Sequence, residues 1–384
     1  MKILFIGARL FNEVAYFAKS KGIETILTES NPDTNNLELA DEYHIVSRGM
    51  EEPMELAISR DVDAVVPLIG IDKPLLEVAQ MKEKLESEYK LPVVSSGVEA
   101  TAIAKDKFKT KKFLQENNIK TPRYNKLNKD QYYQSESPMK YPVVLKQSEG
   151  QGGVGVKISR TSVETKGYLD IFPECMIEEY IEGAEISVEV LRWNGKSVPL
   201  VGVYKGDTTL NGIHPLNKTR IAPVDLNGLN NQELIKLARK ITHKMNTSGT
   251  VEVEFIYDHK KKELNTLEIN TRPSGTRFLT FCSSNINPMH QLVNMALGEW
   301  DPNKLVREIK NYNALELPLP PEVLKSNPKL RNDDNQKRQI LTKEKPYIIH
   351  GPEKASRITI RSSHLEKSWE ILDNLKLDIN KLKH

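Results

Sequence analysis

The stretch LKQSEGQGGVGVKI, residues 145–158, sets a lysine and a glycine-dense turn between two strand-like runs. Glycine permits positive φ and close backbone approach, so Gly150, Gly152 and Gly153 allow several N–H groups to point at the oxygens of a phosphate. Lys146, at the end of the first run, adds a positive charge for the same anion. A glycine-rich hairpin can also serve turn geometry alone, and this stretch by itself leaves both interpretations open.

Length and charge narrow the class of protein. At 384 residues the chain is long enough for two to four compact units. Its 55 basic and 52 acidic residues give a net charge of +3, which argues against nucleic acid as the main partner. No run approaches the roughly 18 apolar residues of a membrane span, so we expect no membrane partner. The two cysteines, Cys175 and Cys282, and the absence of a leader-like cleavage site favour a cytoplasmic protein.

Strand-like and helix-like segments alternate along residues 1–98, which predicts a parallel sheet built from βαβ units. The turn after the first strand reads GARLFN and lacks the three-glycine fingerprint, so we do not expect a nicotinamide or flavin cofactor. The expected strands are 2–6, 24–28, 42–46 and 64–68, with helices at 11–21 and 53–59.

The rest of the chain mixes helices and strands less regularly. We expect one basic amphipathic helix at 101–118 and a polar connection at 128–139. Composition becomes rich in Pro, Asn and Lys after about residue 312. The expected strands are 141–146, 154–158, 186–191, 198–204, 250–257, 264–270, 347–349 and 356–361, with helices at 230–245 and 365–375.

The run VEVEFIY, residues 251–257, alternates apolar and polar side chains with the period of a strand. This pattern puts Glu252 and Glu254 on one face, opposite two valines and a phenylalanine. A polar turn then leads into a second alternating run, so the two runs are expected to form a hairpin.

The second run, LEINTRP, residues 267–273, puts Glu268 and Asn270 on one face and Leu267 and Ile269 on the other. Carboxylate and amide oxygens that converge on one sheet face suit a hard cation such as Mg²⁺. A solvated strand face carries the same residue types, so the pattern alone leaves that alternative open.

Taken together, the ordered motifs resemble the ATP-grasp superfamily, in particular ligases similar to one half of the carbamoyl-phosphate synthase large subunit and to pyrrolysine-pathway amino-acid ligases. The resemblance runs from residue 1 to about 300. It implies a mixed α/β and α+β fold. The implied units are a Rossmann-like pre-ATP-grasp domain at 1–98, a lobe with the glycine-rich loop at 99–177, a lobe with the magnesium site at 178–311, and a small C-terminal α/β accessory segment at 312–384.

The resemblance also implies roles for individual residues. Lys107 and Lys146 match the basic positions on the nucleotide phosphates, and Arg272 matches an arginine near the transferred phosphoryl group. Arg272 and Lys146 are therefore the implied catalytic residues. The implied ATP-binding residues are Lys107, Lys146, Ser148, Glu149, Gly150, Gly152, Gly153, Val154, Glu178, Glu179, Tyr180, Ile181 and Glu185. The implied metal ligands are Glu254, Glu268 and Asn270, with Glu268 bridging two ions.

The implied cofactors are ATP and Mg²⁺, with two ions expected and Mn²⁺ able to substitute. The implied reaction activates a carboxylate as an acylphosphate, which an amine converts to an amide. A bicarbonate-activating enzyme and a nucleotide-binding regulatory subunit are the alternatives. Because the chain shows one grasp unit, we do not expect it to make carbamoyl phosphate alone. A homodimer fits the same resemblance.

The candidates for holding the carboxylate and amine substrates are Arg277, Ser274, Arg220, Asp207 and His214, although His214 equally fits a structural loop role.

Overall fold

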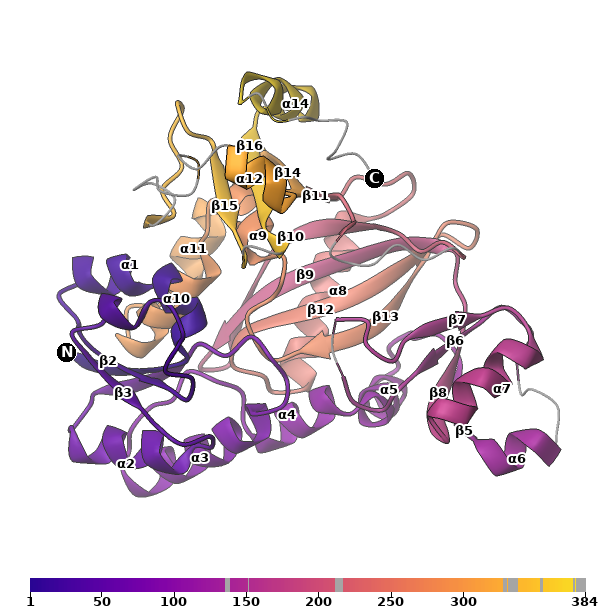
Figure 1. Cartoon of the computed structure of the whole chain (residues 1–384), viewed down its shortest axis with the longest axis horizontal. Helices are drawn as coiled ribbons and strands as arrows, with labels where there is room; N and C mark the ends of the chain where they lie inside the picture. Colours follow the sequence, from indigo (N-terminus) through magenta and orange to yellow (C-terminus); the bar gives the residue numbers. More distant parts are fainter. Residues whose placement is uncertain are drawn as a thin grey trace.

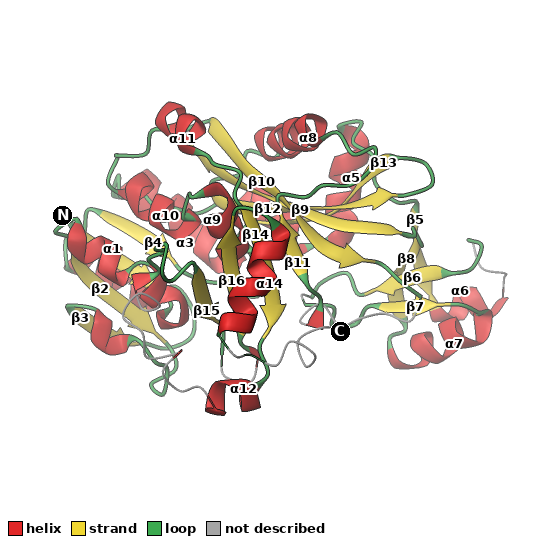
Figure 2. Ribbon diagram, turned by 90° about the horizontal axis from the view of Figure 1, so that it is seen from above, coloured by secondary structure: helices red, strands yellow, loops and turns green. Residues whose placement is uncertain are grey.

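The computed structural model shows three sheets, each with helices packed against it (Figures 1 and 2). The predicted mixture of α/β and α+β architecture is confirmed. No helix within the described ranges is long and apolar enough to cross a membrane. The structure describes residues 1–134, 139–150, 152–210, 217–326, 330, 338–352, 355–375 and 377.

The N-terminal sheet is parallel, as predicted, with strand order β3-β2-β1-β4. Alternate residues of β1 face opposite ways: Ile3 and Phe5 pack in one core cluster, and Leu4 and Ile6 in another. Both faces are thus covered, as a parallel sheet requires. The elements are β1 (Lys2–Ile6), the 3₁₀ helix η1 (Ala8–Glu13), α1 (Ala15–Ser20), β2 (Glu24–Glu29), η2 (Leu37–Leu39), β3 (Glu42–Ile45), α2 (Glu51–Ser59), β4 (Ala64–Pro67) and α3 (Leu75–Glu88).

Two predicted helices are wrong in their details. The helix expected at 11–21 is a 3₁₀ helix followed by the short α1, because the backbone leaves helical geometry at Val14. The helix expected at 101–118 is two helices, α4 (Val98–Lys105) and α5 (Lys107–Glu116). Asp106 separates them: its backbone is extended, and its carboxylate accepts the N–H groups of the first turn of α5.

The second sheet is antiparallel, with strand order β5-β8-β6-β7 (Figure 1). It confirms the predicted hairpin around the glycine-rich loop, although the second strand begins at Lys157 instead of 154. The connection expected at 128–139 contains a helix, since Tyr132 anchors that segment in the core beside Leu127. The elements are β5 (Tyr124–Asn128), α6 (Lys129–Gln134), β6 (Val143–Lys146), β7 (Lys157–Ser159), α7 (Ser162–Ile171) and β8 (Glu174–Glu179).

The third sheet has eight strands in the order β13-β12-β9-β10-β11-β14-β16-β15. Helix α8 packs against it through an apolar cluster that includes Val251, Val253 and Phe255, as the alternation in this run predicted. The strands are β9 (Gly183–Trp193), β10 (Lys196–Asp207), β11 (Arg220–Ala222), β12 (Gly249–Asp258), β13 (Glu263–Asn270), β14 (Asn313–Pro318), β15 (Tyr347–His350) and β16 (Arg357–Ser362). The helices are α8 (Asn231–Lys244), α9 (Arg277–Ser284), α10 (Pro288–Ala296), α11 (Pro302–Glu308), α12 (Pro321–Ser326) and α14 (Leu365–Asn374).

The strands after residue 312 belong to this third sheet and extend it beyond β11. The division expected at 177/178 falls inside β8, while the chain passes from the second sheet to the third between β8 and β9. The four-part division of the chain stays a prediction.

Candidate active site

The glycine-rich loop is tied to the first residue of α5. The backbone N–H of Lys107 donates to the carbonyl of Ser148 at 2.9 Å, and its side-chain Nζ donates to the carbonyl of Gly150, also at 2.9 Å. Gly150, Gly152 and Gly153 have φ of 127°, 66° and 79°, values that favour glycine. The loop residues expected to hold phosphate therefore lie beside the basic start of α5.

Two further loop residues have different surroundings. Glu149 pairs with Lys105, the last residue of α4, at 3.4 Å. Val154 is 77% exposed and extends into solvent from the loop. Glu149 thus links the loop to the body of the molecule, while the side chain of Val154 is largely exposed.

Lys146 lies at the end of β6 and shares the carboxylate of Glu178 with Lys111 of α5. Glu178 and Lys111 are each 1% exposed. Burial lowers the pKa of Lys111 to about 8, although Glu178 opposes the shift. Burial also opposes the charge of Lys146, but the attraction of Glu178 outweighs it and raises the pKa of Lys146. Two lysines around one acid leave this site positively charged, which suits an anion.

The segment from Glu178 to Ile181 connects the second sheet with the third, as expected of a hinge between two lobes. Glu179 accepts from Arg123 at 2.9 Å, and the hydroxyl of Tyr180 donates to the carbonyl of Thr208 at 3.2 Å. Ile181 is buried. These contacts fix the connection from both sides.

Glu185, on β9 just after this connection, has two partners. It accepts from the hydroxyl of Thr208 at 2.9 Å and pairs with Lys218 at 3.0 Å. Lys218 was not predicted as a site residue. It lies shortly before β11, in a polar loop without a pattern that would have marked it.

The acids of β12 and β13 form a carboxylate face, which we define as Glu252, Glu254, Glu268 and Asn270. Glu252 lies directly opposite Asn270 in the strand pairing, and Glu254 opposite Glu268. The side-chain N–H of Asn270 donates to Glu252 at 3.3 Å and to Glu254 at 3.2 Å, which leaves its carbonyl oxygen available. Leu267, predicted to face the core, lies instead at a β-bulge and is half-buried. Glu268 pairs with Glu254 and Thr266 pairs with Phe255, so Leu267 is an extra residue of β13 between two consecutive pairs.

Two lysines neutralise part of the carboxylate face. Lys205 pairs with Glu254 at 2.8 Å, and Lys107 pairs with Glu268 at 3.6 Å. The pKa of Glu254 is lowered because the attraction of Lys205 outweighs the effect of burial. The pKa of Glu268 is raised, first by burial and then by the nearby charge of Glu254.

The carboxylate face offers oxygen ligands only, the type that Mg²⁺ prefers. Across the described residues, no group of three Asp, Glu, His or Cys side chains is arranged to hold a metal ion. The predicted set differs, since it combines two carboxylates, Glu254 and Glu268, with the amide oxygen of Asn270. These three residues fit the ion chemically, and their role as ligands stays a prediction.

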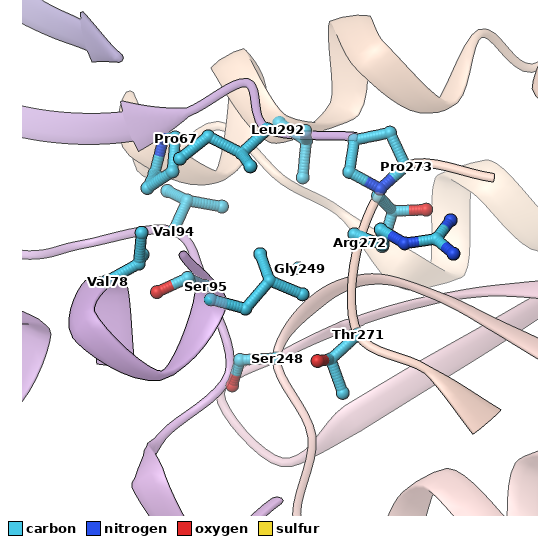
Figure 3. A pocket seen from close by; sticks show the side chains of 13 residues that line it. Pro67, Val78, Val94, Ser95, Ser248, Gly249, Thr271, Arg272, Pro273 and Leu292 are labelled. Carbon is cyan, nitrogen blue, oxygen red and sulfur yellow. The ribbon is translucent and has the colours of Figure 1, made fainter. Parts of the chain in front are cut away.

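The arginines of the segment after β13 reach the N-terminal part of the chain. The Nε of Arg272 donates to Asp72, in the loop between β4 and α3. The guanidinium of Arg277 donates to Glu13 of η1 through two nitrogens, Nε at 2.7 Å and Nη2. Figure 3 shows where the two parts meet: Pro67 and other N-terminal side chains lie across a pocket from Thr271, Arg272 and Pro273.

Three of the predicted substrate residues surround the start of α9. Ser274 donates its hydroxyl to the buried carboxylate of Glu189 at 3.2 Å, and its carbonyl accepts from Arg277 at 2.8 Å. Arg220 donates to the carbonyl of Gly275 at 3.3 Å. The structure thus brings Ser274, Arg220 and Arg277 together.

The other two predicted substrate residues do not join this group. Asp207 lies at the exposed end of β10, where His259 is 3.4 Å away. The role of Asp207 as a substrate contact stays a prediction. His214 lies outside the described residues.

Arg220 also belongs to a buried ionic cluster on the C-terminal strands. Glu316 of β14, which is wholly buried, pairs with Arg220 at 2.9 Å, with Arg357 at 2.7 Å and with His350 at 3.3 Å. Although burial opposes its charge, Arg357 and then Arg220 hold the pKa of Glu316 well below its usual value. Sequence reasoning missed this cluster because four different strands supply its members.

Lys205 was also missed. It lies on β10, separated from the carboxylate face by β9, where the small, buried Ser187 pairs with Glu254 on one side and with Val203 on the other. A serine at this position leaves room for the lysine to cross the strand. The strand order that makes this contact possible is not readable from local sequence.

Comparison with known proteins identifies the family. The sequence pattern of the ATP-grasp domain matches residues 104–276. A protein of Methanobrevibacter smithii named carbamoyl-phosphate synthase is 43% identical over 375 residues, covering 98% of this chain and 100% of its own length. The chain belongs to the ATP-grasp superfamily.

Other relatives agree with this placement. A 3-methyl-D-ornithine–L-lysine ligase of Methanosarcina barkeri is 27% identical over 74% of this chain and 70% of its own length. The ADP complex of purK, an N5-carboxyaminoimidazole ribonucleotide synthetase, has the same fold, with a TM-score of 0.76 at 17% identity over 98% of this chain and 96% of that one. The predicted enzyme class, an ATP-grasp carboxylate–amine ligase, is confirmed by these relatives.

Proposed function

We propose that this protein joins amino acids or small peptides through an amide bond, with ATP and Mg²⁺, by way of an acylphosphate. One observation carries the proposal: a cationic site around Lys111, Lys146 and the glycine-rich loop lies next to the carboxylate face. Lys107 belongs to both, because it binds the carbonyl of Gly150 and pairs with Glu268. A nucleotide triphosphate with its cation needs both kinds of charge at once.

In the first step, a carboxylate oxygen of the acid substrate forms a bond to the γ-phosphorus of ATP, and ADP leaves. Lys146 and Lys107 hold the phosphates, and Arg272 stabilises the charge on the transferred group. When bound to Glu254, Glu268 and Asn270, Mg²⁺ supplies neutralisation of phosphate charge. The ADP complex of purK, which shares the fold, supports a nucleotide as a ligand of this fold.

In the second step, the nitrogen of the amine bonds to the acyl carbon, phosphate leaves and the nitrogen loses a proton. The glycine-rich loop excludes water during this step, because water would hydrolyse the acylphosphate. The exposed Val154 and the run of positive-φ glycines suit a loop that closes over bound nucleotide. Ser274, Arg220 and Arg277 are the residues we assign to the acid substrate.

Activation of bicarbonate is the second candidate. It is favoured by the name of the 43% identical relative, carbamoyl-phosphate synthase, which matches this chain over its whole length. In that reaction the first step is the same, with bicarbonate in place of an organic acid.

The proposal has further parts. It includes two bound Mg²⁺ ions, replacement of Mg²⁺ by Mn²⁺, a homodimer and a cytoplasmic location.

The test is release of ADP and phosphate by the purified protein with Mg-ATP and defined pools of substrates. Release that needs both an acid and an amine, together with a product of the corresponding mass, supports amide ligation. Release with bicarbonate alone replaces it with the second candidate. No release with any amino acid, peptide or bicarbonate, in protein that binds ATP, contradicts both.

A further inference from the structure

We propose that Glu252 is a positioning residue for the magnesium site. It holds the side-chain amide of Asn270 so that the carbonyl oxygen, and not the nitrogen, is left for the cation. The inference rests on the proposed function, in which Mg²⁺ binds Asn270 together with Glu254 and Glu268. Glu252 is not among those ligands, although it lies on the same strand as Glu254 and directly opposite Asn270.

The amide nitrogen of Asn270 is engaged by two carboxylates. Its Nδ2 donates to Oε2 of Glu252 at 3.3 Å and to Oε1 of Glu254 at 3.2 Å, so both of its N–H groups are used. An ionised carboxylate only accepts hydrogen bonds, and the amide oxygen cannot donate one. Turning the amide over would therefore break both contacts and set an oxygen against two acids. The two glutamates thus fix which end of Asn270 faces away from them.

Glu252 is the buried member of the carboxylate face. Its side chain is 4% exposed, against 22% for Glu254 and 29% for Glu268. No three Asp, Glu, His or Cys side chains of the described ranges are arranged to hold a metal ion, which argues against Glu252 as a third carboxylate ligand. A cation bound to Glu254 competes with Asn270 for the oxygens of that residue. Glu252 then remains as the acceptor that keeps the amide in place.

Glu252 is itself held in position. Its Oε1 accepts from the hydroxyl of Thr276 at 3.2 Å, and the ammonium of Lys205 lies 3.8 Å from the same oxygen. Thr276, immediately before α9, is 2% exposed. One oxygen of Glu252 is thus anchored, and the other is bonded to Asn270. Hydrogen bonds of this kind orient metal ligands and contribute to metal affinity.

The experiment measures binding of a non-hydrolysable ATP analogue by calorimetry, once with Mg²⁺ and once with EDTA. Glu252→Met removes the acceptor, and we expect the Kd of the magnesium complex to rise roughly 10- to 100-fold. The Kd of the metal-free analogue should stay within about twofold, because Asn270 binds the metal and not the nucleotide. Thermal melts of each variant report folding.

Glu252→Gln is the matched control. Its carbonyl oxygen still accepts from Asn270, and its nitrogen can donate to the hydroxyl of Thr276, so the Kd of the magnesium complex should stay within about threefold. A loss as large as that of Glu252→Met overturns the proposal, because Glu252 then acts through its charge or as a ligand. Equal losses with and without Mg²⁺ in Glu252→Met overturn it as well, since the role is then structural.

A double-mutant cycle tests whether the effect passes through Asn270. In an Asn270→Ala background there is no amide to orient, so Glu252→Met should change the Kd of the magnesium complex by less than about twofold. Fully additive losses overturn the proposal. If the unchanged protein binds the analogue equally well with Mg²⁺ and with EDTA, the magnesium site of the proposed function fails before any variant is compared, and this inference fails with it.

Discussion

The second and third sheets carry opposite balances of charge at the candidate site. On the second sheet, Lys111 and Lys146 share a single acid, Glu178. On the third sheet, the three acids of the carboxylate face, Glu252, Glu254 and Glu268, outnumber Lys107 and Lys205, the lysines that pair with them. Both sites are largely buried, so each charge depends on a specific partner.

The comparison shows that the two sheets suit ligands of opposite charge. The surplus of lysine on one sheet suits the phosphates of a nucleotide, and the surplus of acid on the other suits its cation. Each surplus is unfavourable until the matching ligand binds, because like charges lie close together at low exposure. Under the proposed function, binding of the nucleotide–metal complex relieves both surpluses of charge at once.

We expect the largest effect on activity from the removal of one acid from the carboxylate face. Glu268→Gln should lower ATP turnover at least about a thousandfold, equivalent to about 4 kcal/mol, since a neutral amide neither binds Mg²⁺ as tightly nor balances Lys107. Steady-state ADP release at saturating ATP measures the effect. Glu263→Gln is the control, because Glu263 lies on the same strand in a half-exposed pair with Lys120 and should leave turnover unchanged. Full activity of Glu268→Gln would exclude the metal assignment.

The corresponding test on the second sheet removes the single acid. Glu178→Gln leaves Lys111 and Lys146 facing each other without a counter-charge and should lower the free energy of unfolding by about 3 kcal/mol. We expect a loss of free energy at the lower end of the range for a broken buried ion pair, because Lys111, with a pKa of about 8, can release its proton. Urea unfolding at pH 7 measures the loss.

The neighbouring residue gives a sharp control for this prediction. Glu179 pairs with Arg123, whose side chain is 81% exposed. Glu179→Gln should therefore change the free energy of unfolding by less than about 1 kcal/mol. Equal losses in the two variants would show that the buried lysines do not depend on Glu178.

Local sequence predicted the parts of the site that a strand or a turn presents by itself. The alternation around Glu252 and Glu254 and the glycine-rich hairpin needed no knowledge of the fold. The break at Asp106 was also readable, because an acid before a basic helix is a capping signal. Reading the segment as one helix missed it, since the apolar spacing continues across the break.

Other contacts were beyond local sequence because the fold creates them. Asp72 and Arg272 are 200 residues apart, and Glu13 and Arg277 are 264 apart. Lys205 and Glu254 lie on strands that both pair with β9. Lys205 reaches across β9 to Glu254 because the residue between them on β9 is the small Ser187. Such contacts follow from strand order and from the packing of the N-terminal part against the third sheet.

The last prediction uses the acid that no lysine neutralises. Glu189 is 1% exposed, lies opposite Glu252 in the strand pairing, and accepts from Thr250 at 2.6 Å. Burial raises the pKa of Glu189 to about 7, against 4.5 for an ordinary glutamate. Between these values the folded protein holds a proton that the unfolded chain has lost, so stability from this group falls as pH rises.

Glu189→Gln removes this titration while keeping the shape of the side chain. From pH 5 to pH 8, the unchanged protein should lose about 2 kcal/mol more unfolding free energy than the variant. Urea unfolding of both proteins at the two pH values measures the difference, in which titrating groups that do not interact with Glu189 cancel. Parallel losses would mean that Glu189 is ionised in the folded protein. The surplus of acid on the third sheet would then be larger than the contrast with the second sheet assumes, because Glu189 would add its charge to that of the carboxylate face.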